Sequence, residues 1–218
     1  MAVLNMKLTI TITILSVGLF NNLLGQQNPF KTFFEEKVKA LRDAGLFQEY
    51  SKLELKQLTQ KIIDLETELN GGFFEEEYPQ DDQLRTFINL AKWDKQRVWF
   101  DDLEADVCEE NKVYTTVIKD FGHMTNLLQP TNIVEKWRTK TGPVEITFEN
   151  KGQRFNLTPK YNDDWLDMEP LLDTFNKILY PSGQRFEILE NTDQQLFVIR
   201  LTVREKERLT KDFKIKFV

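Results

Sequence analysis

The chain has 218 residues, of which 29 are Lys or Arg and 35 are Asp or Glu, giving a net charge of −6 at pH 7. An acidic chain without a basic run lacks the electrostatic pattern of a nucleic-acid-binding protein and does not favour anionic lipid surfaces. Cys108 is the single cysteine, so no internal disulfide framework is possible. The length suffices to bury a core without one.

The first 25 residues have the layout of a secretory signal peptide. Lys7 precedes an uncharged run over residues 8–20, and a polar stretch then leads to Gly25, a small residue suited to a signal peptidase. The run is too short for a membrane span, which needs roughly 20 apolar residues. We therefore expect cleavage after Gly25, no membrane span in the mature chain, and a periplasmic or extracellular location. The lack of paired cysteines favours a bacterial cell envelope over a secreted eukaryotic setting.

Residues 26–72 are predicted to form a helical hairpin. Phe33, Phe34, Val38 and Leu41 recur at helical spacing, and Gly45 is a natural end for that helix. A second helix is expected to open at Ser51, with Glu54 completing a capping box. Its apolar face would end before Gly71 and consist of Leu55, Leu58, Ile62, Leu65 and Leu69. Such a hairpin must bury its apolar stripe on the rest of the chain or on a partner.

Residues 73–96 are predicted to be an acidic connector followed by a short helix whose apolar side carries Leu84, Phe87, Ile88 and Ala91. An α+β domain would then occupy residues 97–218. It would begin with a strand near residues 98–100 and a helix near residues 111–121 that Gly122 ends.

Two ββα units are predicted over residues 143–213. In the first, alternating residues at 144–148 and 155–157 flank a turn at residues 150–152, and a helix starts near Asp167. In the second, a hairpin over residues 186–201 turns at residues 191–193, and a helix follows the capping box of Thr202 and Glu205. Hairpins alternating with helices predict an α+β fold, with one antiparallel sheet and helices on one face.

An acidic group near the start of this domain is a candidate metal site. In an extended segment, Asp102, Glu104 and Asp106 would lie on one face, because strand side chains alternate. Three carboxylates in that arrangement suit a hard cation such as Ca²⁺ or Mg²⁺. A solvated strand face, or acids that cap the following helix, would explain the same pattern without a metal.

Patterns typical of catalysis are missing from the sequence. The single histidine, His123, excludes a zinc site with two or three histidines. The acidic neighbours of Cys108 do not favour the thiolate that a nucleophilic cysteine needs. The nine glycines form no phosphate-binding loop.

The sequence therefore favours an exported, soluble, non-catalytic binding or protein-interaction module of the bacterial cell envelope, with a protein partner there and no nucleic acid. A first alternative is a hydrolase or metal-binding protein that depends on a divalent metal at Asp102, Glu104 and Asp106. A second alternative is a carbohydrate-binding module, since a sugar-binding groove could be lined by Trp93, Trp99, Trp137 and Trp165.

Overall fold

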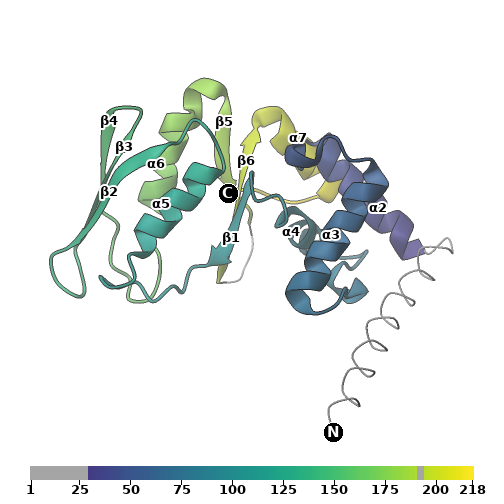
Figure 1. Cartoon of the computed structure of the whole chain (residues 1–218), viewed down its shortest axis with the longest axis horizontal. Coiled ribbons are helices and arrows are strands. Elements are labelled where there is room, and N and C mark those ends of the chain that lie inside the picture. The colour runs from purple at the N-terminus through teal and green to yellow at the C-terminus, as the bar shows by residue number, and fades with distance from the viewer. Residues whose placement is uncertain (1–28, 191–193) are drawn as a thin grey trace, which may run out of the picture.

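Two three-stranded antiparallel sheets alternate with two groups of helices in this computed structural model, which describes residues 29–190 and 194–218 (Figure 1). The strands are β1 (Val98–Asp102), β2 (Pro130–Trp137), β3 (Val144–Asn150), β4 (Gln153–Leu157), β5 (Gln184–Ile188) and β6 (Gln195–Thr202). The helices are α2 (Pro29–Asp43), α3 (Leu55–Asn70), α4 (Gln83–Ala91), α5 (Val113–His123), α6 (Glu169–Leu179) and α7 (Val203–Phe213), with 3₁₀ helices η1 (Gln48–Tyr50), η2 (Glu75–Glu77) and η3 (Tyr180–Ser182). The protein is thus an α+β protein, as the sequence predicts.

The sheet of order β1-β6-β5, called the central sheet below, separates two hydrophobic cores. Phe197 and Ile199 of β6 belong to the core that also contains α2, α3, α4 and α7. Val198, between them, belongs to the core formed with α5, α6 and the second sheet. Successive side chains of a strand point to opposite faces, so a strand buried on both faces is apolar throughout. Figure 1 shows the resulting layers: sheet, helices, central sheet, helices.

The predicted helical hairpin is present and buries its apolar stripe within this chain. Phe34, Val38 and Leu41 of α2 and Leu58 and Ile62 of α3 are at most 1% exposed. The predicted start of the second helix was wrong. It begins at Leu55 rather than near Ser51, and the side chain of Gln57 accepts the Glu54 backbone N–H at 2.9 Å.

The predicted end of the next helix was also wrong, because α5 continues through Gly122 to His123. A side chain at Gly122 would collide with Pro130, since a Cβ there would lie 2.8 Å from the Pro130 Cδ. Glycine thus serves a close packing contact here rather than a helix end.

The two predicted hairpins exist, but they lie in different sheets. β3 and β4 pair with β2 in the second sheet, of order β2-β3-β4, whereas β5 and β6 pair with β1. Helices therefore cover both faces of the central sheet instead of one. The Thr202–Glu205 capping box of α7 is confirmed.

Three predicted features stay predictions. The predicted signal peptide, residues 1–25, and the turn at residues 191–193 lie outside the described residues. The unit boundaries at residues 72 and 96 also stay a prediction. Among the helices the structure describes, none is long and apolar enough to cross a membrane.

Candidate ligand-binding site

The three carboxylates of the predicted metal site do not share a strand face, because β1 ends at Asp102. Asp102 Oδ1 accepts the backbone N–H of Glu104 at 2.9 Å. Glu104 Oε2 accepts Nε2 of Gln194 at 2.6 Å. Asp106 has a φ of 43°, and its Oδ2 accepts Nδ2 of Asn111 at 2.9 Å. Each carboxylate thus has a hydrogen-bond partner of its own.

Within residues 29–190 and 194–218, no group of three or more His, Cys, Asp or Glu residues is placed to hold a metal ion. The Ca²⁺ or Mg²⁺ site at Asp102, Glu104 and Asp106 stays a prediction from the sequence.

The tryptophans proposed for a sugar-binding groove come from different parts of the molecule. Trp99 is buried against Phe121, with ring centroids 5.5 Å apart. The rings of Trp137 and Tyr161 pack edge to face with their centroids 6.1 Å apart, while Trp165 is 38% exposed. Carbohydrate binding likewise stays a prediction.

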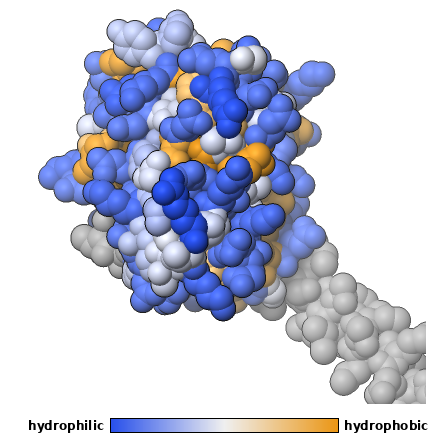
Figure 2. Space-filling view, turned by 90° about the vertical axis from the view of Figure 1, so that its left-hand side faces the viewer, coloured by the Kyte–Doolittle hydropathy of each residue, from blue (hydrophilic) through white to orange (hydrophobic). Residues whose placement is uncertain are grey.

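The outer face of the β2-β3-β4 sheet offers little apolar surface. Figure 2 views this side, where hydrophilic side chains cover most of the surface and leave smaller apolar areas between them. Along β3, Val144, Ile146 and Phe148 are buried, so the polar residues between them point outward.

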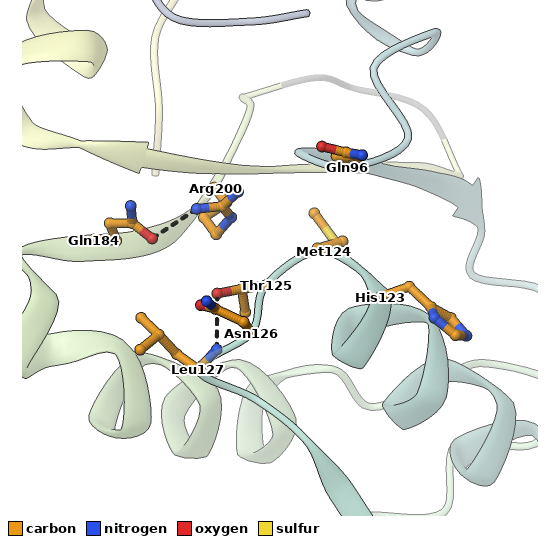
Figure 3. A pocket seen from close by; sticks show the side chains of 8 residues that line it. All are labelled: Gln96, His123, Met124, Thr125, Asn126, Leu127, Gln184 and Arg200. Atoms are coloured by element: carbon orange, nitrogen blue, oxygen red, sulfur yellow. Dashed lines mark hydrogen bonds between the residues drawn. The ribbon is translucent and has the colours of Figure 1, made fainter. Parts of the chain in front are cut away.

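A hollow of about 440 Å³ lies at one end of the central sheet, beside the loop that follows α5 (Figure 3). Its walls come from segments distant in sequence: Gln96 precedes β1, Gln184 begins β5, Arg200 lies in β6, and residues 123–127 follow or end α5. The antiparallel order β1-β6-β5 brings these strand ends together. Figure 3 shows Arg200 and Thr125 facing across the hollow, whereas the His123 side chain points away from it.

Arg200 is the charged group of this hollow, and Gln184 positions it. Its Nη1 donates to Oε1 of Gln184 at 2.7 Å, while its buried Nε has no hydrogen-bond partner among the described residues. Neither Asp nor Glu lies within ion-pair distance of its guanidinium in the described parts of the chain. Burial lowers the pKa of Arg200, and so does the nearby positive charge of Arg97, while Asp94 and Glu205 oppose that shift. An arginine remains protonated regardless, so a partly buried positive charge faces the hollow.

A second hollow, of about 250 Å³, adjoins the first and shares Gln96, Gln184 and Arg200 with it. Its floor holds an ion pair in which Arg97 Nη1 and Nη2 donate to the two Glu205 oxygens at 2.8 and 2.9 Å. The Arg97 Nη1 also donates to the Gly45 carbonyl oxygen, which ties the end of α2 to the start of β1.

Asp94 completes this charged group. It is 1% exposed, and its Oδ2 accepts the Phe47 N–H at 2.6 Å. Burial raises the pKa of Asp94, although backbone N–H groups and the arginines oppose that shift. The balance of charge around Arg200 therefore depends on the protonation of Asp94.

Sequence reasoning missed these residues. The one local signal was Arg200 itself, a charged residue in the apolar run of residues 196–201. Its neighbours in space come from segments that only the sheet order joins. Comparisons with protein-family models, with curated proteins and with solved structures found no match.

Proposed function

We propose that this protein is an exported, non-catalytic binding module of the bacterial cell envelope, and that its ligand places a carboxylate in the hollow around Arg200. The observation that carries the proposal is the partly buried Arg200 guanidinium, which is positioned by the neutral Gln184 and has no carboxylate at ion-pair distance among the described residues. A partly buried positive charge without a carboxylate at ion-pair distance is costly, and a bound anion would compensate for it more directly than the nearby Asp94 and Glu205 do.

The surroundings favour a monoanion such as a carboxylate over a phosphate. A guanidinium forms parallel hydrogen bonds with a carboxylate, and side-chain amides can bind its remaining lone pairs. The hollow lies at the C-terminal end of α5, where the helix dipole is negative, and Glu205 and Asp94 lie nearby. A doubly charged anion would meet more repulsion there.

Acetate is the direct probe of this site. Amide NMR titration of the purified protein should show saturable shifts at Gln96 and Thr125, with a Kd on the order of 1 mM, or about −4 kcal/mol. Arg200→Met should abolish these shifts. Arg185→Met, at an exposed arginine of the adjacent strand, is the matched control and should retain them. Phosphate that binds more tightly than acetate would contradict the carboxylate assignment, and no saturable binding of either anion would refute the site.

Export is tested separately. The full-length chain, expressed in a bacterium with a periplasm, should accumulate outside the cytoplasm with Gln26 as its first residue by N-terminal sequencing. An uncleaved cytoplasmic chain would overturn that part of the proposal.

A further inference from the structure

We propose that the carboxylate belongs to an acidic side chain of an extended peptide, whose main chain continues from the hollow around Arg200 into the second hollow beside Gln48. This inference rests on the proposed function and names the ligand class.

The first step is continuity of the cavity. The two hollows, of about 440 and 250 Å³, share Gln96, Gln184 and Arg200 as lining residues. Together they cover the end of the central sheet, from the loop after α5 to the end of α2. A ligand group at Arg200 is therefore in contact with the wall of both hollows, and a ligand longer than a single carboxylate has the second hollow to occupy.

The second step is the chemistry of the walls. Among the described residues, only Met124 and Leu127 are apolar in the lining of the first hollow, and none that lines the second has an apolar side chain. Sites for compact small molecules are lined mainly by apolar and aromatic side chains. A ligand with polar groups along its length fits these walls better than a compact apolar one.

The third step is hydrogen bonding. Gln48, Gln96 and Asn126 are exposed, and their side chains line the hollows without a hydrogen bond to another described residue. A carboxamide presents a donor and an acceptor together, as a peptide group does. Side chains of this kind at successive points of a cavity can bind successive groups of an extended main chain, while Arg200 binds an acidic side chain.

The fourth step is rigidity. The Arg97 side chain is 7% exposed and is held by Glu205 and the Gly45 carbonyl oxygen. The floor of the second hollow is therefore ordered before a ligand arrives, which reduces the entropy lost on binding.

The test uses arrayed pentapeptides of the form Ac-X-X-Glu-X-X-NH₂ and their Gln counterparts, followed by calorimetric titration of the tightest Glu peptide. The intact protein should bind that peptide at least tenfold more tightly than it binds acetate. Replacement of the Glu in the peptide by Gln should weaken the binding of the peptide at least tenfold. Gln48, which lines only the second hollow, supplies the critical variant. Gln48→Ala should weaken peptide binding at least threefold and leave acetate binding unchanged. Gln153→Ala, at an exposed glutamine of β4, should change neither.

The outcomes separate the two proposals. Acetate binding at Arg200 with no peptide tighter than acetate would overturn the peptide inference and leave the carboxylate site standing. A tight peptide that Gln48→Ala does not weaken would also overturn it, since the main chain would then avoid the second hollow. Absence of both acetate and peptide binding would overturn the proposed function as well.

Discussion

The ion pair between Arg97 and Glu205 gives a quantitative test of the structure. Its two hydrogen bonds measure 2.8 and 2.9 Å, and the side chains of Arg97 and Glu205 are 7% and 22% exposed. Removing one partner of a buried pair costs roughly 3–5 kcal/mol. Because Glu205 is partly exposed and a Gln can still accept one N–H, we expect Glu205→Gln to lower the free energy of unfolding by about 2 kcal/mol at pH 7. In a chain of this size that corresponds to a fall in Tm of roughly 4–8 °C.

The effect should depend on pH in a defined direction. Burial acts to raise the pKa of Glu205, but hydrogen bonds from Arg97 and from the Thr202 backbone outweigh it, and the pKa is lowered overall. A lowered carboxyl pKa stabilises the fold above the unfolded-state value of about 4.3, and this stabilisation is lost as the pH falls through the folded-state pKa. The difference in the free energy of unfolding between wild type and Glu205→Gln should therefore have its full size at pH 7 and become smaller below pH 4.

Urea unfolding at several pH values measures this difference. Glu207→Gln, at an exposed acid of the same helix, is the matched control and should change stability by less than about 0.5 kcal/mol. A difference that is constant from pH 3 to pH 7, or a control effect of equal size, would refute the reasoning.

Three further substitutions test neighbouring features. Gln184→Glu should place a carboxylate at ion-pair distance from Arg200, which would weaken acetate binding at least tenfold in the NMR titration without lowering Tm. Unchanged acetate binding would contradict the role of the Arg200 charge in binding the anion. Asp94→Asn should leave stability nearly unchanged at pH 4 and raise it relative to wild type toward pH 8 in urea unfolding. The reason is that burial raises the pKa of Asp94, so wild type loses stability as the pH rises and this carboxyl group becomes charged in the folded protein, whereas Asn stays neutral. If the stability of Asp94→Asn relative to wild type fell as the pH rose, the result would contradict this reasoning. Gly122→Ala should destabilise by about 1 kcal/mol although alanine favours helices, because its Cβ would meet Pro130 at 2.8 Å; a stabilised variant would show that the contact relaxes freely.

The sequence was informative where local patterns and burial agree. In β3, strict alternation predicts the strand, because Val144, Ile146 and Phe148 are buried and the residues between them are not. The Thr202–Glu205 capping box likewise predicts the start of α7. Both signals are local, so they can be recognised in the sequence without knowledge of the tertiary structure.

Strand β2 shows why other elements were missed. The pairing of β2 with β3 shifts register between Thr131 and Val134, and Asn132 has a φ of 50°. A bulge of this kind interrupts the alternation of buried and exposed residues, so a period-two search finds no strand there. Gly122 is a similar case, since its requirement for glycine comes from Pro130 and not from the helix itself.

The candidate site could not be predicted because its residues meet only through the sheet order. Gln96, Gln184 and Arg200 belong to three chain segments, and β6 lies between β1 and β5 only in the folded protein. For the predicted acidic group the reverse holds, because closeness in sequence does not bring the carboxylates to a shared site. Asp102, Glu104 and Asp106 are close in sequence, but the end of β1 gives each carboxylate a separate hydrogen-bond partner.

Two neighbouring arginines, compared directly, distinguish a structural role from a binding role. The Arg200 backbone N–H donates to the Arg97 carbonyl oxygen at 2.8 Å, so both occupy the same end of the sheet. Arg97 forms an ion pair with both oxygens of Glu205, whereas Arg200 donates to the neutral Gln184 and, among the described residues, has no carboxylate within ion-pair distance. A charge kept for stability should be costly to remove, and a charge kept for a ligand should not.

Arg97→Met should therefore lower the free energy of unfolding by roughly 3 kcal/mol, because it leaves Glu205 without its partner. Arg200→Met should leave stability within about 0.5 kcal/mol of wild type, or raise it, while acetate binding is lost. Urea unfolding of both variants decides the matter, and a large destabilisation by Arg200→Met would make Arg200 a structural residue.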